Sequence, residues 1–226
     1  MKSYLDLVPQ YEKVHRKQSK MSRICIILAV FLVAVMFGLA DMYLQGVTQK
    51  VMQENGDWHY QITSIDTKTS DLIAARPEVE VSGWHSTISA DAGYSINGQP
   101  IAISGLDEDV FGEIYLASLA EGKYPNAANE IAVSSVLKES NDLDLGSVID
   151  LTCPDGSTVS FSIVGFFDNP EKARLIAGSE QSVILAQDGF TTFISASNSP
   201  ASEKYIIQLS QHCDMSSTIE KIKSQY

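Results

Sequence analysis

The sequence is poor in cysteine and in basic residues, and both shortages narrow the kinds of protein it can be. It holds three cysteines in 226 residues, too few for a small scaffold held together by disulfides. Lysine and arginine total 16 against 28 aspartates and glutamates, which gives a formal net charge of −12. A nucleic-acid binder needs a basic face to meet phosphate, so we expect no nucleic-acid partner.

Motifs for catalysis and metal binding are also lacking. There is no Walker motif, so the chain cannot hydrolyse ATP by itself, and there is no Gly-x-Ser-x-Gly elbow or Ser-x-x-Lys motif with its partner motifs. The histidines lie too far apart in sequence to indicate a metal site, except for His212 beside Cys213, whose side chains would point apart on a strand. We therefore expect no catalytic residue, no metal and no cofactor.

Two features leave alternatives open. The acidic triplet Asp107–Asp109 is typical of a solvated turn or a helix N-terminus, but it could also bind a cation weakly. Cys25 lies in an apolar stretch, whereas Cys153 and Cys213 follow it and either pair or remain separate thiols.

One stretch of the chain is long and apolar enough to cross a membrane. Residues 24–40 carry no charge, and the apolar pattern continues past Asp41 to Leu44, giving 21 residues and about 31 Å of helix. We predict a transmembrane helix over residues 24–44, in contact with membrane lipid. Asp41 would lie at the outer interface, either reaching interfacial water or serving a function. No later stretch is comparably long and apolar.

The charges around this stretch predict its orientation. Residues 1–23 hold six basic and two acidic side chains, whereas the remainder holds ten basic and 26 acidic ones. The positive-inside rule therefore places the N-terminus in the cytoplasm and the main domain outside the cell membrane. A signal peptide cleaved after Ala40 is the alternative, but a 40-residue leader exceeds the usual length. The topology signal consists of Arg16, Lys17, Lys20 and Arg23.

The basic segment 1–23 has a helical pattern of its own. Its apolar residues share one helical face beside lysines and arginines, which predicts an amphipathic segment lying on the inner leaflet; the alternative is a solvated leader. The face consists of Tyr4, Leu7, Val8, Tyr11 and Val14. Beyond the span, we expect the helix to continue as a stalk over residues 45–56 and to stop at Gly56.

The remaining residues, 57–226, predict a mixed α/β domain rich in hairpins. Asn97-Gly98 and the stretch 154–157 are turn signals between apolar runs. Ser134 or Ser135 is expected to cap the start of a short helix that runs to Glu139, and Gly146 is expected to cap a short helix that precedes residue 148. The expected strands are 57–62, 78–82, 94–96, 101–103, 130–133, 148–153, 158–167, 182–185, 190–194 and 203–210, and the expected helices are 70–75, 134–139 and 216–226. The fold class is therefore α+β, with one N-terminal transmembrane helix.

Three stretches together resemble a known family. They are the head and anchor SYLDLVPQYEKVHRKQSKMSRICIILAVFLVAVMFGLADM, the phrase LAEGKYPNAANEIAVS at 119–134, and LDLGSVIDL at 143–151 with a hairpin that ends in Val164-Gly165-Phe166. In this order they resemble the N-terminal part of FtsX-like ABC transporter permeases, with a MacB-type extracytoplasmic core domain over residues 57–226. The resemblance spans nearly the whole chain.

The resemblance implies a function. The chain would be the N-terminal portion of a permease subunit, non-catalytic, coupling a cytoplasmic ABC ATPase to the external domain for export or mechanotransmission. The partners implied are the ATPase, the rest of the permease and a second permease copy, and the core domain would lack a closing strand at its C-terminal end. The alternatives are an autonomous single-pass binding or regulatory protein and an anchored or secreted hydrolase.

Overall fold

The structure, a computed structural model, describes residues 16–197, 200–210 and 212–225. The chain divides into two compact units, residues 1–50 and 51–226, and each is described by itself. The amphipathic face predicted for the head, Tyr4, Leu7, Val8, Tyr11 and Val14, lies outside the described residues.

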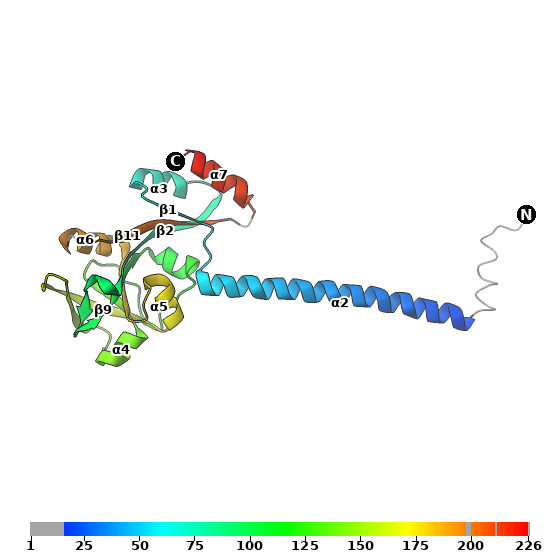
Figure 1. Cartoon of the computed structure of the whole chain (residues 1–226), viewed down its shortest axis with the longest axis horizontal. Coiled ribbons are helices and arrows are strands. Elements are labelled where there is room, and N and C mark those ends of the chain that lie inside the picture. The colour runs from blue at the N-terminus through cyan, green and yellow to red at the C-terminus, as the bar shows by residue number, and fades with distance from the viewer. Residues whose placement is uncertain (1–15, 198–199, 211, 226) are drawn as a thin grey trace, which may run out of the picture. The chain divides into compact units, whose positions relative to one another are not determined.

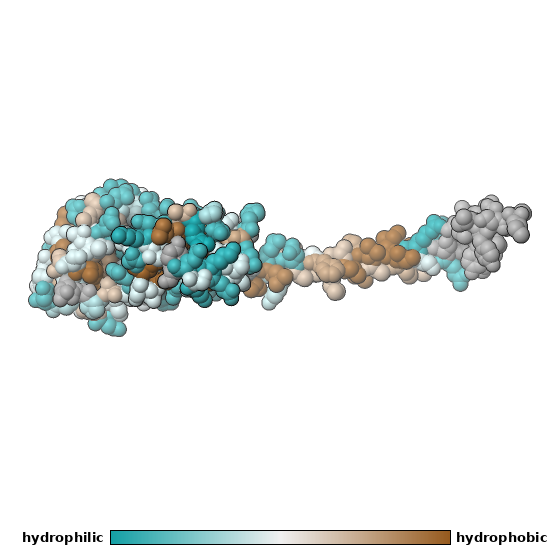
Figure 2. Space-filling view, turned by 90° about the horizontal axis from the view of Figure 1, so that it is seen from above, coloured by the Kyte–Doolittle hydropathy of each residue, from teal (hydrophilic) through white to brown (hydrophobic). Residues whose placement is uncertain are grey.

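A single helix, α2 (Arg16–Asn55), occupies the described part of the first unit and continues into the second (Figure 1). Its 40 residues correspond to about 60 Å of helix. Its apolar side chains are exposed, and Figure 2 shows them as a band along the helix. A helix that is apolar on all sides needs lipid or other helices around it. Among the described residues, α2 is the one helix long and apolar enough to cross a membrane.

The second unit is built on one mixed sheet. In the described chain its eleven strands run in the order β1-β11-β2-β5-β10-β7-β9-β8-β3-β4, with β6 paired to β9. The pairs β5–β10 and β7–β9 are parallel and the other pairs are antiparallel. The strands are β1 (Tyr60–Thr63), β2 (Val79–Ile88), β3 (Ser95–Ile96), β4 (Gln99–Pro100), β5 (Ala102–Leu106), β6 (Glu121–Gly122), β7 (Glu130–Ser134), β8 (Val148–Thr152), β9 (Thr158–Phe167), β10 (Ser182–Ala186) and β11 (Ser202–Leu209).

Helices cover both faces of this sheet. Neighbouring residues of β11 point to opposite faces, and Tyr205 packs with Ile73 of α3 and Ile222 of α7, whereas Ile206 packs in the cluster that holds Ile176 of α5. Figure 1 shows α3 and α7 next to each other on one side of β1, β2 and β11. The helices are α3 (Thr67–Ala74), the 3-10 turn η2 (Ala90–Ala92), the π-helix η3 (Val110–Ile114), α4 (Ser135–Asn141), α5 (Pro170–Ala177), α6 (Gln187–Ser197) and α7 (Met215–Gln225).

The predicted turn at Asn97-Gly98 and the predicted hairpin around 154–157 are both confirmed. Asn97 and Gly98 have φ of 50° and 78°, the positive values that a tight turn between β3 and β4 requires. Strands β8 and β9 pair antiparallel from Thr152 opposite Thr158. The strand at 130–133 is β7, and the Ser134 hydroxyl accepts from the Leu137 N–H at the start of α4, as predicted.

Three local predictions are wrong. Residues 190–194 are not a strand but part of α6, because Phe190 and Phe193 are buried at helical spacing in the main hydrophobic cluster. Helix α4 ends at Asp142 in the left-handed conformation, so Gly146 does not cap it. The strand at 101–103 does not form the partner strand of the Asn-Gly turn: the Ile101 N–H donates to the Tyr94 carbonyl over 3.1 Å, but β5, which begins at Ala102, pairs with β2 and β10.

Two of the sequence stretches that resemble the permease family, 119–134 and 164–166, come together where β6 pairs with β9. Gly122 pairs with Gly165, and a Cβ on Gly122 would lie 2.1 Å from the Val164 carbonyl oxygen. A Cβ on Gly165 would lie 2.6 Å from the Lys123 carbonyl oxygen. Neither position can hold a side chain, so both glycines are required for close approach of two backbones.

Candidate functional site

The last turn of α2 is anchored in the second unit, and we call the contacts around it the helix junction. Gly56 ends the helix with φ of 84°, and its N–H donates to the Met52 carbonyl over 2.8 Å. A Cβ at this position would lie 3.1 Å from the Ile114 carbonyl oxygen and 3.2 Å from the Tyr115 ring. A side chain here would therefore be both strained and crowded.

The residues after Gly56 are tied to two other elements. The Asp57 N–H donates to the Ile114 carbonyl of η3 over 2.7 Å. The Asp57 carboxylate accepts from Gln208 Nε2 of β11 over 2.7 Å, and the Trp58 indole N–H donates to the Asn55 carbonyl over 2.9 Å. Hydrogen bonds thus hold the chain between the end of α2 and the start of β1, so this connection is not a loose linker.

Lys172 of α5 joins the helix end to η3. Its side chain is buried, with 8% of the residue exposed, and Nζ donates to the Gln53 carbonyl over 2.7 Å and to the Tyr115 carbonyl over 2.5 Å. The last carbonyls of a helix have no partner within it and carry partial negative charge, so an ammonium is well placed there. Burial nevertheless lowers the pKa of Lys172.

Tyr115 extends the junction into the sheet. Its hydroxyl donates to His85 Nδ1 over 2.6 Å, and His85 Nε2 in turn donates to the Ile176 carbonyl at the other end of α5 over 2.8 Å. A carbonyl can only accept, so the proton of the neutral imidazole is on Nε2. Burial, followed by the positive charge of Lys204, lowers the pKa of His85 to about 3. Burial raises the pKa of Tyr115.

Helix α5 therefore holds the junction from both of its ends. Its start is fixed by Asn169, whose Oδ1 accepts from the N–H groups of Glu171 and Lys172, and by Pro170 in the first turn. The junction network is uncharged apart from the Lys172 ammonium and the Asp57 carboxylate. The network fixes the helix end to α5, η3 and the sheet.

The residues predicted from sequence lie elsewhere. Lys17, Lys20 and Arg23 lie in the first turns of α2, which begins at Arg16. The Asp41 carboxylate accepts from Gln45 Nε2 over 3.1 Å, one turn along the same helix. None of these residues is part of the helix junction. Sequence reasoning missed Lys172, Tyr115 and His85; only Asn169-Pro170 carried a usable signal, that of a helix start.

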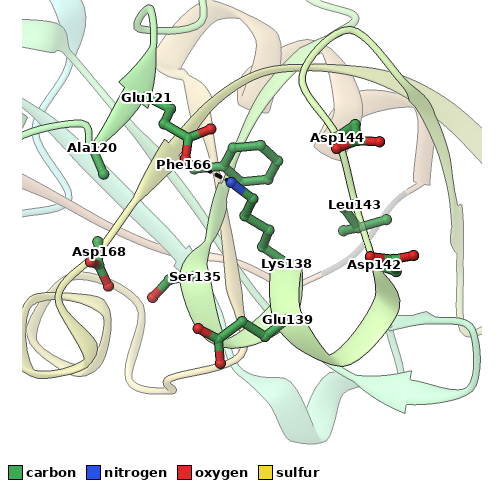
Figure 3. A pocket seen from close by; sticks show the side chains of 10 residues that line it. All are labelled: Ala120, Glu121, Ser135, Lys138, Glu139, Asp142, Leu143, Asp144, Phe166 and Asp168. Atoms are coloured by element: carbon green, nitrogen blue, oxygen red, sulfur yellow. Dashed lines mark hydrogen bonds and ion pairs between the residues drawn. The ribbon is translucent and has the colours of Figure 1, made fainter.

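A second candidate is a surface hollow of about 330 Å³ beside α4 (Figure 3). The Lys138 ammonium pairs with Glu121 over 2.8 Å and lies 4.3 Å from the centre of the Phe166 ring. The remaining carboxylates at its rim are those of Glu139, Asp142, Asp144 and Asp168. Within the described ranges, no three or more His, Cys, Asp or Glu residues are grouped so that they could hold a metal ion. The triplet 107–109 leads into η3, and Asp107 accepts from the Trp84 N–H over 2.8 Å.

The three cysteines lie outside both the helix junction and the hollow beside α4. Cys153 is buried in the main cluster and Cys213 lies beside the cluster of α3 and α7. Both are free thiols, as is Cys25 on α2.

Comparison with solved structures places the fold. The chain is similar to the periplasmic region of MacB from Actinobacillus actinomycetemcomitans, with a TM-score of 0.53, 8% identity and 73% of each chain covered. It is also similar to a domain of a protein described as a permease from Porphyromonas gingivalis (TM-score 0.49, 12% identity, 73% of this chain and 71% of that chain). A third is the extracellular domain of the noncanonic ABC-type transporter YknZ from Gram-positive bacteria (TM-score 0.45, 9% identity, 72% of this chain and 78% of that chain). No curated protein matches the sequence.

The sequence itself matches a family described as the MacB-like periplasmic core domain, over residues 22–225. The match covers the apolar helix as well as the sheet domain, so it accounts for nearly the whole chain. This family is a non-catalytic component of permeases, which confirms the expectation that the chain is not an enzyme. The chain belongs to the family of MacB-like periplasmic core domains of ABC transporter permeases.

Proposed function

We propose that the chain is the N-terminal portion of an ABC permease subunit and that the helix junction transmits movement between its membrane helix and its external domain. The observation that carries this proposal is the pair of hydrogen bonds that Lys172 Nζ donates to the carbonyls of Gln53 and Tyr115. One buried cation thereby links the end of α2 to two elements of the external domain. A flexible linker would absorb a movement of the helix, whereas a connection fixed by hydrogen bonds transmits the movement to the external domain.

The proposed topology follows from the charges and from α2. Residues 1–23 lie in the cytoplasm, with Tyr4, Leu7, Val8, Tyr11 and Val14 on the inner leaflet; residues 24–44 cross the membrane, 45–56 form the stalk and 57–226 are extracytoplasmic. The support is the exposed apolar surface of α2 after the basic cluster Arg16, Lys17, Lys20 and Arg23. Asp41 then lies at the outer membrane edge.

The proposed partners are a cytoplasmic ABC ATPase, the rest of the permease and a second permease copy. The chain has no Walker motif, so the energy for movement has to come from another protein or domain. In this assignment, membrane lipid surrounds residues 24–44 of α2.

The test uses the permease complex purified from its native membranes. A fluorophore on Val148→Cys, at a site 70% exposed on β8, reports on the external domain after the native cysteines are changed to serine. We expect ATP to change the fluorescence in the parent protein. Lys172→Met should abolish that change while ATP hydrolysis continues, and Lys68→Met, at an exposed site on α3, should leave it intact.

Two results would contradict the proposal. An ATP response that survives both Lys172→Met and Gly56→Ala would show that the junction does not transmit movement. If no ATPase purifies with the chain, the autonomous single-pass binding protein becomes the better assignment.

A further inference from the structure

A hollow of about 500 Å³ lies on the sheet face that α5 covers, between β2, β11 and the end of α5. It is separate from the helix junction, although His85 contributes to both. Its polar lining consists of Lys204 of β11, His85 and Thr87 of β2, Ser89, Asp91 of η2, Arg174 of α5 and Ser179.

The acceptors nearest to Lys204 are already occupied. His85 lies directly opposite Lys204 across the β2–β11 pair, but one of its ring nitrogens accepts from Tyr115 and the other donates to Ile176. The Ile176 carbonyl also accepts from the Ser104 hydroxyl over 3.2 Å, so both of its lone pairs are used. The Lys204 ammonium therefore has no acceptor on the floor of the hollow.

The acids around the hollow do not supply one either. Glu180 forms an ion pair with Arg174, and Asp91 is exposed on η2. Among the described residues, none accepts a hydrogen bond from Lys204 Nζ or lies within ion-pair distance of it. Burial lowers the pKa of Lys204, which is the sign of an ammonium that has lost water without gaining a counter-charge.

Besides the exposed Asp91 carboxylate, the hollow has hydroxyl groups that are able to donate. The Ser179 hydroxyl accepts from the Gln181 N–H and keeps its own proton free to donate, and the Ser89 hydroxyl accepts from the Asp91 N–H in the same way. Thr87 adds a third hydroxyl to the wall. A lysine without an acceptor, in a hollow whose lining also carries three hydroxyls, is suited to an oxyanion. A lysine without an acidic partner is unusual in a chain of net charge −12.

We propose that this hollow is a binding site for a small anion with a carboxylate or phosphate group, held by Lys204 with the hydroxyls of Thr87, Ser89 and Ser179. The anion would supply the acceptor that the ammonium lacks. The volume also fits an organic molecule that carries such a group.

The test measures thermal unfolding of the full chain in detergent while inorganic phosphate or acetate is titrated against chloride at matched ionic strength. We expect a saturable rise in Tm with at least one of the two anions. Saturation by phosphate alone would identify a phosphate ligand, and saturation by acetate alone would identify a carboxylate ligand. A rise with neither anion would overturn the proposal.

Three variants assign the effect to the hollow. Lys204→Gln should raise the half-saturating concentration at least tenfold, whereas Lys204→Arg, which keeps the charge, should bind within a few-fold of the parent. Lys221→Gln, at an exposed site on α7, is the matched control and should behave like the parent. If Lys204→Gln responds as the parent does, the anions act elsewhere on the protein and the site does not exist.

Discussion

Lys172 of α5 and Lys204 of β11 are both connected with the buried His85, Lys172 through Tyr115 and Lys204 from directly across the β2–β11 pair, and they differ in what their ammonium groups contact. Lys172 donates to the Gln53 and Tyr115 carbonyls, whereas Lys204 has no acceptor among the described residues. Burial lowers the pKa of both. The difference teaches that burial of a lysine alone does not define its role: a paired ammonium joins elements of the fold, and an unpaired one leaves capacity for a ligand.

Removing the paired charge should have the largest effect. Lys172→Met keeps most of the aliphatic stem but leaves two carbonyl groups without a donor in a buried place. We expect a loss of about 2–4 kcal/mol in the free energy of unfolding. Urea unfolding of the full chain in detergent measures it, because both tryptophans, Trp58 and Trp84, lie in the second unit and report on it alone.

The control for this loss is Lys68→Met. Lys68 is exposed on α3, so its substitution should change stability by no more than about 0.5 kcal/mol. Equal losses in the two variants would mean that the bonds of Lys172 contribute nothing specific.

The buried His85 makes the free energy of unfolding depend on pH. Its pKa is about 3 in the folded state, below its ordinary value of 6.5, so the unfolded chain binds a proton that the folded domain does not. The stabilisation is complete above pH about 6.5 and is lost as the pH falls toward about 3. One proton is worth about 1.4 kcal/mol per pH unit, so about 2–3 kcal/mol should be lost between pH 6.5 and pH 4.5.

The contribution of His85 is isolated by comparing how steeply the free energy of unfolding falls with pH in the parent and in a variant. His85→Gln cannot take up a proton, so its stability should fall less steeply with pH than that of the parent, whatever its stability at neutral pH. Carboxylates with a lowered pKa, such as Glu130, contribute equally to both proteins. Parallel pH curves would show that His85 does not titrate on unfolding.

Gly56 tests the junction through the backbone instead of a charge. Gly56→Ala places a Cβ in a left-handed conformation and 3.1 Å from the Ile114 carbonyl oxygen. We expect a loss of about 1–2 kcal/mol in the same urea experiment. Gly112→Ala is the matched control in the same unit: Gly112 lies in η3 without a left-handed φ, and no heavy atom lies within 4 Å of the added Cβ, so no loss is expected there.

Local rules predicted much of the fold. The Asn97-Gly98 turn, the β8–β9 hairpin and the Ser134 cap each depend on residues close in sequence, and all three are confirmed. The segment 190–194 failed because its β-branched threonines favour a strand locally, whereas Phe190 and Phe193 pack in the core from one side of a helix. Tertiary packing decided the structure of that segment.

The helix junction could not be predicted in the same way. Lys172 and Gln53 are 119 positions apart, and Tyr115 and His85 are 30 apart. Nothing in the residues around Lys172 shows that its ammonium is buried, because lysine is usually exposed. The resemblance to permeases identified the domain, but a family motif marks backbone features such as Gly122 and Gly165 and not the hydrogen bonds of the helix junction.

Removing the unpaired charge should have the smallest effect and the opposite sign. In anion-free buffer, Lys204→Met removes an ammonium that has lost part of its hydration without gaining an acceptor, while the stem still packs in the hollow. We expect the free energy of unfolding to rise by about 0.5–1 kcal/mol. Lys123→Met is the comparison: its exposed ion pair with Glu130 should be worth about 0–0.5 kcal/mol in the stabilising direction, so stability should stay level or fall slightly. A loss of stability in Lys204→Met as large as that in Lys172→Met would mean that both lysines serve the fold alike, and the contrast between them would not hold.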